Sequence, residues 1–495
     1  MIYVHIPFCR SFCTYCDFYS EVAAKCRGAE EACNQEAMFG RFADALCKEI
    51  RHRADEISDE VNTLYIGGGT PSVLPLHVLK RVFDALEETG HGGPYDEFTV
   101  EVNPEDIVDK GEDYIRGLME LGVSRISMGV QSFDDSILRF MNRRHDAATA
   151  RRAYAMLESA GIINISIDLI FGLPQLSDDQ WKQTLDSALH ISSKGGPPQH
   201  ISSYQLSVEP GSMLAKLVER GKWQEASEEL CERQYRLLCQ ALHEAGYRHY
   251  EISNFALPGF EARHNSAYWR HIPYAGFGPA AHSLRVCSQT LCAPVAPSHQ
   301  WLSSGPATAG CSLQKSTGLF AETLSTPTRG WENATSALQA PGDDNSKMLR
   351  YIRQWNEPDL QKYMEDPTEI MDGEDLTEEQ VVMERVMLAL RTCDGMEEEY
   401  LRAHCNPVRI DQALASGDLV RIPASPGTPE PDSPGTPGHT VTEADSPGTS
   451  GHTVTEPDSP GTLGPTVTEP AGPCSRLRIP EDRFFVSDMI IADLV

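Results

Sequence analysis

Long hydrophobic runs are missing from this sequence. No apolar stretch reaches the roughly 18 residues that a membrane-spanning helix needs. No secretory leader is recognisable either, because Met1 opens directly into a strand-like run. These absences argue against a membrane-spanning or secreted protein. We therefore expect a soluble, cytoplasmic protein without a transmembrane segment.

Positive charge is also scarce. The chain has 42 Lys and Arg residues against 72 Asp and Glu residues, which gives a formal net charge of -30. Proteins that bind the phosphate backbone of nucleic acids need a surplus of Lys and Arg. The composition therefore argues against a nucleic-acid partner, and we expect the acidic surface mainly to keep the protein soluble.

Paired cysteines of the kind that bind zinc are largely absent. Structural zinc sites commonly use two C-x2-C pairs, and only one such pair is present here. Instead, Cys9, Cys13 and Cys16 form a C-x3-C-x2-C run directly after an apolar segment. Three thiolates on one loop can bind three irons of a four-iron cluster and leave the fourth iron open, whereas ferredoxin-type clusters normally use four cysteines. The spacing therefore predicts an iron–sulfur cluster with an exchangeable position, and the scattered remaining cysteines are expected to be free thiols.

Short apolar runs alternate with amphipathic stretches over the first 208 residues. The strand-like runs contain β-branched or aromatic residues in alternation and lie at Ile2–Ile6, Asn62–Ile66, Phe98–Val102, Ser124–Val130, Asn164–Phe171 and His200–Val208. Apolar residues at helical spacing lie between them, at 39–50, 78–88, 115–121, 147–160 and 181–191. Six such β-α steps predict an α/β fold with a parallel sheet and right-handed crossovers.

Polar residues and glycines cluster near the ends of these predicted strands. The turn Gly67-Gly68-Gly69-Thr70-Pro71 follows the second strand, and Gln131 follows the fourth. Glu101 and Asp168 lie toward the ends of the third and fifth strands, and Tyr204 lies on the sixth. In β/α barrels, the chemistry gathers at the carboxyl ends of the strands. We therefore expect these residues to share one mouth with the cysteine loop.

The composition divides the chain into four parts. Residues 1–208 form the predicted barrel, and residues 209–284 form a segment that caps it. Residues 285–346 are rich in Ser, Thr, Ala, Pro and Gly and predict a surface insertion. Residues 347–495 predict a helix-rich C-terminal domain with helices at 347–363 and 376–420, a β-hairpin wing that starts at Val420–Ile422, and an ordered end at 484–495. At about 425–473 a 13-residue repeat of the type Ser-Pro-Gly-Thr interrupts the wing and is predicted to be disordered.

Several motifs occur in the same order as in a known family. They are Tyr3-Val-His-Ile-Pro-Phe-Cys9, the glycine turn, Glu101-Val-Asn-Pro104, Ser127-Met-Gly-Val-Gln131 and Ile167-Asp-Leu-Ile-Phe-Gly-Leu-Pro174. With the cysteine spacing, they resemble the oxygen-independent coproporphyrinogen III oxidase family of radical S-adenosylmethionine (SAM) proteins. The resemblance covers about residues 1–284 and resumes at about residue 347. It implies a radical SAM partial (β/α)6 TIM-like barrel with a smaller helix-rich C-terminal domain.

The resemblance also implies a set of ligands by position. Cys9, Cys13 and Cys16 would ligate a 4Fe-4S cluster whose open iron is chelated by the amino and carboxylate groups of SAM. Eight residues would surround the SAM: Tyr3, Gly68, Gly69, Thr70, Glu101, Gln131, Arg143 and Asp168. The residue types suit these roles, since glycines allow close backbone approach and an arginine can bind a carboxylate through two hydrogen bonds.

Two departures from the pattern separate this chain from the enzymes of the family. The enzymes carry a further cysteine two positions after the third, where this chain has Phe18. They also carry a long arm before the equivalent of Tyr3, and because this sequence starts at Met1, we expect no such arm. The motif His264-Asn-Ser-Ala-Tyr-Trp269 instead resembles the H-N-x-x-Y-W motif of the HemW-type heme chaperone branch.

This branch implies a heme chaperone that binds heme and transfers it to an unidentified acceptor protein, with a respiratory enzyme as one candidate. Heme would be held by His264, Tyr268 and Trp269, because a neutral imidazole can ligate iron and aromatic faces suit a flat macrocycle. The alternatives are a true oxidase, which would convert coproporphyrinogen III to protoporphyrinogen IX by radical SAM oxidative decarboxylation, and another radical SAM enzyme. No catalytic residue is assigned.

Overall fold

The main unit of the protein is a nine-stranded sheet. The computed structural model describes residues 1–23, 29–58, 60–288, 349–423 and 475–495. Its large sheet has the order β11-β1-β4-β5-β6-β7-β8-β10-β9. Six neighbouring strands are parallel and follow chain order: β1 (Ile2–Ile6), β4 (Thr63–Gly68), β5 (Glu97–Val102), β6 (Arg125–Gln131), β7 (Asn164–Phe171) and β8 (His200–Gln205). The predicted parallel α/β sheet is confirmed, although the last of the six strands ends at Gln205 instead of Val208.

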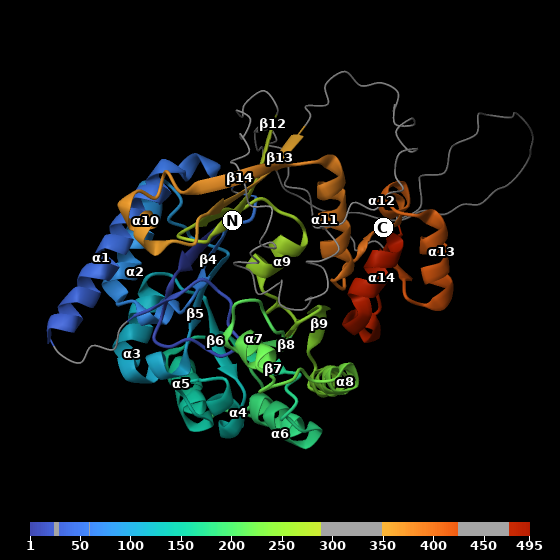
Figure 1. Cartoon of the computed structure of the whole chain (residues 1–495), viewed down its shortest axis with the longest axis horizontal. Helices are drawn as coiled ribbons and strands as arrows, with labels where there is room; N and C mark the ends of the chain where they lie inside the picture. Colours follow the sequence, from blue (N-terminus) through green and yellow to red (C-terminus); the bar gives the residue numbers. More distant parts are fainter. Residues whose placement is uncertain (24–28, 59, 289–348, 424–474) are drawn as a thin grey trace, which may run out of the picture.

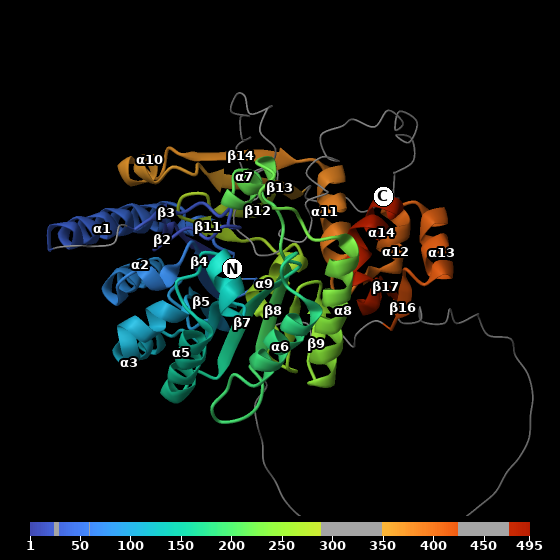
Figure 2. The ribbon, with the colours of Figure 1, turned by 60° about the horizontal axis from the view of Figure 1, so that its bottom comes forward.

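Helices cover the outer face of this sheet (Figures 1 and 2). They are α1 (Ala29–His52), α2 (Leu76–Glu88), α3 (Pro104–Glu120), α4 (Asp135–Phe140), α5 (Ala147–Ala160), α6 (Asp178–Leu189) and α8 (Glu228–Glu244). Local sequence sets their ends, as in α5. The Asp146 side chain accepts a hydrogen bond from the Thr149 amide at its start, and Gly161 ends it at a φ of 99°. The apolar side of α2, which includes Val78 and Val82, is buried against the strands.

Three shorter strands extend the sheet beyond the six predicted ones. β11 (Ala275–Phe277) runs parallel to β1 at one edge. At the other end of the sheet, β10 (Asn254–Ala256) pairs antiparallel with β8, and β9 (Arg248–Glu251) pairs antiparallel with β10. Each strand has only three or four residues, which is too short for alternation to reveal it in a sequence.

A second sheet corrects one sequence-based prediction. β13 (Leu349–Asn356) lies between β12 (His282–Ser288) and β14 (Met371–Leu376), antiparallel to both. The helix predicted at 347–363 was therefore wrong, and only α10 (Leu360–Glu365) is helical there. Every second residue of β13 from Ile352 onward is buried, which is the period of a strand. The insertion boundary predicted at 285 falls inside β12, and the insertion itself lies largely outside the described residues.

The C-terminal part is helix-rich, as predicted. It contains α11 (Glu378–Leu390), α12 (Glu398–His404), α13 (Pro407–Ser416) and α14 (Ser487–Leu494). The predicted wing is present, because β17 (Arg476–Arg478) pairs antiparallel with both β16 (Val420–Ile422) and β15 (Met396–Glu397). The repeat predicted at 425–473 lies outside the described residues. In Figure 1, this part stands beside α8 and β9, at the end of the sheet away from α1.

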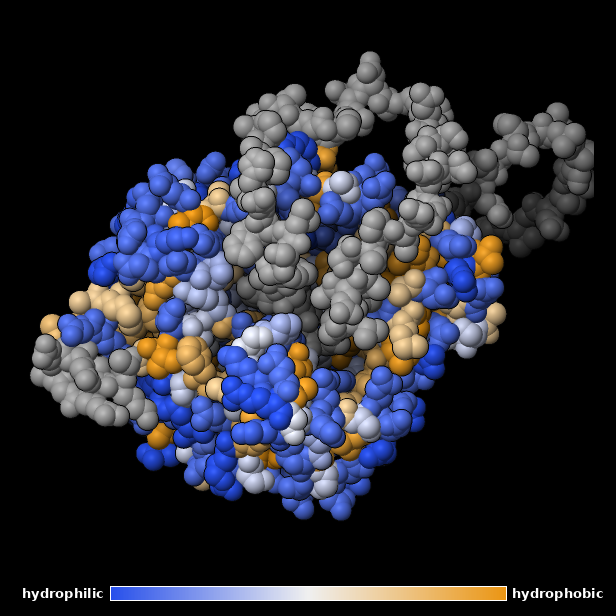
Figure 3. Space-filling model, in the orientation of Figure 1, coloured by the Kyte–Doolittle hydropathy of each residue, from blue (hydrophilic) through white to orange (hydrophobic). Residues whose placement is uncertain are grey.

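The visible surface is mostly hydrophilic. Hydrophilic residues cover most of the face in Figure 3, and hydrophobic residues form small separate patches. Among the helices that the structure describes, none has both the length and the hydrophobicity to cross a membrane.

Candidate cofactor site

The inner face of the large sheet is unusually polar. Along β4, Leu64 and Ile66 belong to the hydrophobic core beneath the helices, whereas Tyr65 bonds to Glu101 of β5 across the inner face. On the neighbouring strands, Ser127 bonds to Asp168, and Ser166 bonds to His200. Because side chains alternate between the two faces of a strand, each strand gives this interior one polar residue in two. The parallel strands thus enclose a region suited to a polar ligand.

The cysteine loop covers the carboxyl ends of the strands. Cys9, Cys13 and Cys16 all line one cavity of about 160 Å³. Backbone hydrogen bonds hold the loop on two sides, from the Thr14 amide to the Met141 carbonyl at 3.2 Å and from the Leu214 amide to the Thr14 carbonyl at 2.8 Å. Arg10 adds an ion pair with buried Asp106 of α3, with Nε 2.9 Å from Oδ1. The loop position is therefore set by α3, by the end of α4 and by α7 (Met213–Glu219).

The surroundings of the thiols suit thiolate ligands. Cys9 Sγ lies 3.4 Å from the Thr70 hydroxyl, and the Arg143 guanidinium donates to Cys13 Sγ at 3.4 Å. Burial raises the pKa of the Cys9 thiol, so its thiolate needs a stabilising partner such as a metal. Within the described residues, no group of three or more His, Cys, Asp or Glu side chains is arranged to hold a metal ion. Three soft sulfur donors that line one cavity without forming a single-ion site suit a cluster instead, in which each thiolate would bind a different iron.

The glycine turn is required by the packing of the chain itself. Gly68 has a φ of 108°, and a Cβ there would lie 2.8 Å from the His5 ring. A Cβ on Gly69 would lie 2.8 Å from the Phe8 carbonyl oxygen and 3.1 Å from Cys9 Sγ. Both glycines therefore let β4 approach β1 and the cysteine loop closely. Gly68, Gly69 and Thr70 also line the cavity.

Arg143, Gln131 and Asp168 line the same cavity. Arg143 is fixed by hydrogen bonds to Asn103 Oδ1 at 2.6 Å and to the Gly129 carbonyl at 2.7 Å. Gln131 has a φ of 66° and follows a break in the β6–β7 register, which directs the chain away from the strand. Burial raises the pKa of Asp168 to about 6, although Arg125 and nearby hydroxyls act in the opposite direction.

Tyr65 connects the cavity with the H-N-x-x-Y-W motif. Its hydroxyl donates to Glu101 Oε1 at 2.7 Å, and its ring lies 5.1 Å from the ring of His264. Glu101 lines the cavity, whereas Tyr3 does not and instead bonds to His5 Nδ1 at 2.9 Å. Sequence analysis missed Tyr65, together with the cavity-lining residues Asn103, Arg125, Ser202 and Asn265. The alternation in β4 and β6 places Tyr65 and Arg125 on the same face as Thr63 and Ser127, which is a signal that could have found them.

The predicted heme residues lie on α9 (Arg263–Trp269), which packs against the start of β4. The first amides of α9, from Arg263 and His264, donate to the Glu97 carboxylate at 2.9 and 3.1 Å. His264 is fully buried. Its Nδ1 bonds to the Thr63 hydroxyl at 2.8 Å and its Nε2 to the Tyr268 hydroxyl at 3.0 Å. Burial also lowers the pKa of His264 well below its usual value, so the ring is neutral. Both ring nitrogens are therefore already engaged in this conformation.

The comparisons with known proteins agree with this geometry. Residues 3–188 match the radical SAM superfamily. The structure is similar to that of an Escherichia coli coproporphyrinogen III oxidase (HemN), which is described as a radical SAM enzyme. The TM-score is 0.58 and the sequence identity is 19%, and the match covers 84% of this chain and 83% of that chain. The fold and the cysteine-lined cavity thus define a radical SAM protein.

Sequence identity with known proteins identifies the family within the radical SAM class. The chain is 35% identical to the heme chaperone HemW of Synechocystis over 281 residues, which are 57% of this chain and 65% of that protein. It is 34% identical to the heme chaperone HemW of Lactococcus lactis over 280 residues, which are 56% of this chain and 68% of that protein. The chain belongs to the HemW family of heme chaperones. The matched stretch covers about two thirds of the length of these relatives.

Proposed function

We propose that this protein binds heme and transfers it to an acceptor protein, and that it carries a 4Fe-4S cluster and SAM in the cavity beneath the cysteine loop. The observation that supports the cofactor site is the gathering of Cys9, Cys13, Cys16, Arg143 and Asp168 around one cavity. The cluster and SAM supply one-electron chemistry when both are bound. The heme acceptor is a second protein that the structure does not contain.

Each of the predicted cluster and SAM residues has a proposed role in this site. The three cysteines hold the cluster. Arg143, already fixed by Asn103 and Gly129, presents its guanidinium to the SAM carboxylate. Asp168 would accept hydrogen bonds from the ribose hydroxyls, and Glu101 would accept a hydrogen bond from a polar group of SAM. Gln131 and the turn Gly68-Gly69-Thr70 complete the walls, and Tyr3 supports them indirectly through His5.

Heme binding by His264, Tyr268 and Trp269 remains a proposal, and it requires a conformational change. His264 can ligate iron only after one of its two ring hydrogen bonds breaks, and Trp269 is 3% exposed. We therefore propose that α9 moves away from Glu97 and Thr63 when heme binds. A His264→Ala variant that retains the hemin Soret shift would exclude His264 as the iron ligand.

The test of the function compares two activities of the anaerobically reconstituted protein. Hemin is added first, and a shifted Soret band with transfer to an apo-heme protein supports the chaperone. The same preparation then receives SAM, a reductant and coproporphyrinogen III. Formation of protoporphyrinogen IX would show instead that the protein is an oxidase, despite Phe18 at the position of the fourth cysteine.

The cluster assignment has its own test. A Cys13→Ser variant should lose the brown chromophore after anaerobic reconstitution, because a hydroxyl is a poor ligand for iron. Cys405→Ser serves as the control, since Cys405 is a free thiol outside the cavity. Iron and sulfide content measures the outcome, and unchanged values in the Cys13 variant would contradict the assignment.

A further inference from the structure

Arg125 is a buried cation that lines the cavity and has no ion-pair or hydrogen-bond partner among the residues that the structure describes. It is the first residue of β6, is 1% exposed and lines the same cavity as the cysteines. Among the described residues, its guanidinium forms neither an ion pair nor a hydrogen bond, and its Nε is buried without a partner. A lone buried charge is costly, so a charge that persists there calls for a bound counter-ion.

Among the described residues, no nearby group forms a direct ion pair or hydrogen bond with this guanidinium. The Asp168 carboxylate is close enough for Arg125 to lower its pKa, yet it bonds to the Ser127 hydroxyl instead. Glu97 accepts hydrogen bonds from two backbone amides of α9. His200 is neutral, because burial lowers its pKa well below the usual value. The guanidinium therefore remains available to a ligand.

A second polar group lies on the same cavity. Asn265 of α9 is 6% exposed and lines the cavity, and its side-chain amide forms no hydrogen bond within the described parts of the chain. It belongs to the H-N-x-x-Y-W motif, whose histidine is engaged elsewhere. A guanidinium and a primary amide on one cavity are a donor set that suits a carboxylate.

We infer that Arg125, with Asn265, binds a carboxylate group of the ligand that enters the barrel, and that this group is a propionate of a tetrapyrrole. The identity of the ligand rests on the proposed function, whereas the carboxylate chemistry rests on the two unpartnered side chains. SAM also has a carboxylate, but Arg143 stands beside the cysteine loop and is the guanidinium placed for it. Arg125 thus provides a separate anion subsite.

The first test asks whether Arg125 stabilises the empty protein. Arg125→Met should leave the melting temperature of the protein without heme unchanged or raise it, because the variant removes a buried charge that has no direct ion pair or hydrogen bond and keeps an unbranched, flexible side chain. Arg152→Met on the exposed side of α5 is the matched control. A clear loss of stability in the Arg125 variant alone, repeated in Arg125→Gln, would mean that Arg125 has a structural partner and would overturn the inference.

The second test measures carboxylate recognition. Hemin and hemin dimethyl ester, in which both propionates are blocked, are titrated by their Soret bands into the reconstituted protein with SAM. We expect the wild type and Arg152→Met to bind hemin roughly 10- to 100-fold more tightly than the diester. Arg125→Met should lose this preference while cluster content and SAM affinity stay unchanged.

The outcomes separate the two proposals. If the wild type binds hemin and the diester equally, or if Arg125→Met keeps the preference, the carboxylate subsite is wrong and the heme function stands. If the wild type binds neither, the proposed heme function fails and the tetrapyrrole ligand fails with it. If Arg125→Met loses SAM affinity as well, Arg125 serves the SAM carboxylate and the separate subsite is overturned.

Discussion

At the residue scale, single polar side chains position charged residues of the cavity. Glu101 is oriented by the Tyr65 hydroxyl, Asp168 by Ser127, and Asn103 holds Arg143. None of these supporting residues follows from the cysteine motif alone. They give this part of the cavity a defined geometry, because Glu101, Asp168 and Arg143 each have a neighbour that restricts their rotamers.

Tyr65→Phe tests this support. The variant keeps the ring against His264 but removes the 2.7 Å hydrogen bond to Glu101. We expect SAM to bind about 3- to 10-fold more weakly, because Glu101 is then less well oriented. Calorimetric titration of SAM into the reconstituted protein measures this. Tyr114→Phe is the control, since the buried Tyr114 hydroxyl has no hydrogen-bond partner, and an equal effect in both variants would contradict the positioning role.

At the element scale, short segments join the large sheet to the C-terminal helices. Glu251 of β9 forms a bridge with Thr392 just after α11, and the Cys393 amide donates to the Tyr250 carbonyl at 3.0 Å. Glu251 is fully buried at this junction and accepts hydrogen bonds from the Ser253 amide and the Asn254 side chain. The protonation of Glu251 therefore depends on its burial where the large sheet meets the C-terminal helices.

This junction should make stability depend on pH. Burial raises the pKa of Glu251 from 4.5 to about 7. Between these values, the unfolded state has released its proton while the folded state keeps it, so the free energy of unfolding falls as the pH rises through this window. Glu251→Gln mimics the protonated acid and should be equal to the wild type near pH 4.5. At pH 8 it should be more stable by up to roughly 3 kcal/mol.

The measurement is denaturant unfolding of both proteins across this pH range. Glu365→Gln, on the exposed side of α10, provides the control for removing one negative charge. A stability difference between the Glu251 variant and the wild type that does not change with pH would contradict the predicted titration.

The wing gives a second prediction at this scale. Ile422 of β16 is the Cα partner of Arg476 of β17, so the strands that flank residues 424–474 are paired with each other. Replacing residues 424–474 by Asn-Gly, a common two-residue hairpin turn, should keep β16 and β17 paired. We expect the melting temperature and the hemin affinity to stay nearly unchanged. Calorimetry and Soret titration measure both, and a large loss of either would show that the segment contributes to the fold or the function.

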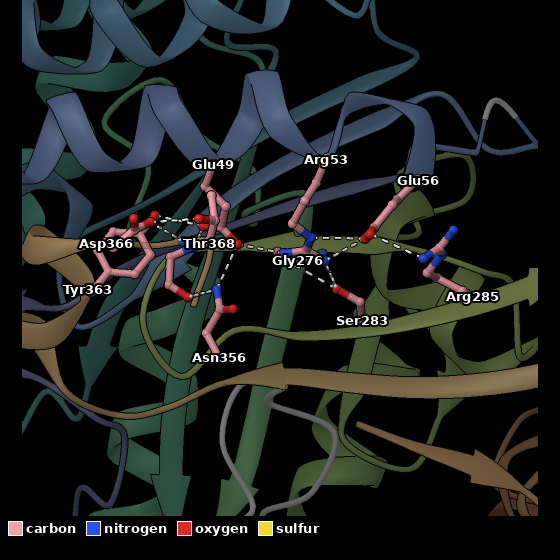
Figure 4. Close-up of polar contacts among 11 residues, drawn as sticks. Glu49, Arg53, Glu56, Gly276, Ser283, Arg285, Asn356, Tyr363, Asp366 and Thr368 are labelled. Atoms are coloured by element: carbon pink, nitrogen blue, oxygen red, sulfur yellow. Dashed lines mark hydrogen bonds and ion pairs between the residues drawn. The ribbon is translucent and has the colours of Figure 1, made fainter. Parts of the chain in front are cut away.

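At the scale of the whole molecule, a buried polar network connects α1 to chain segments more than 200 residues away (Figure 4). Glu49 accepts hydrogen bonds from the Gly278 amide at 2.9 Å, from Asn356 at 2.8 Å and from the Tyr363 hydroxyl at 2.7 Å, and it pairs with Arg53. Arg53 in turn donates to the Gly276 carbonyl and the Ser283 hydroxyl. One carboxylate thus joins α1, β13, α10 and the end of β11.

Glu49→Ala should be strongly destabilising. It leaves buried donors of three segments without their acceptor, and breaking a buried ion pair on one side costs about 3–5 kcal/mol. Lys48→Ala is the control, because the adjacent Lys48–Asp366 pair is largely exposed and its loss should cost less than about 1 kcal/mol. Denaturant unfolding measures both variants. Similar losses would mean that the network does not join the two parts of the chain energetically.

The sequence determined the features that depend on local pattern. Alternating apolar residues fixed five of the six parallel strands to within about two residues, because half-buried strands have a period of two. The spacing of Cys9, Cys13 and Cys16 predicted the candidate cluster loop. The positions of polar residues at the ends of the strands predicted which side chains line the same cavity. Only the predicted range of the last strand was too long, because residues 206–208 continue the alternating apolar pattern after β8 has ended at Gln205.

Only the tertiary structure decided how distant segments meet. The helix predicted at 347–363 is wrong because β13 is stabilised by pairing with β12, about 60 residues earlier, and with β14, which follows α10. His264 was expected to face a heme, but the packing of α9 against β4 uses both of its ring nitrogens. Strand alternation can place Arg125 on the inner face of β6, but only the structure shows that it has no ion-pair or hydrogen-bond partner among the described residues. Periodicity and spacing are local properties of a chain, whereas burial and hydrogen-bond satisfaction depend on residues brought together by folding.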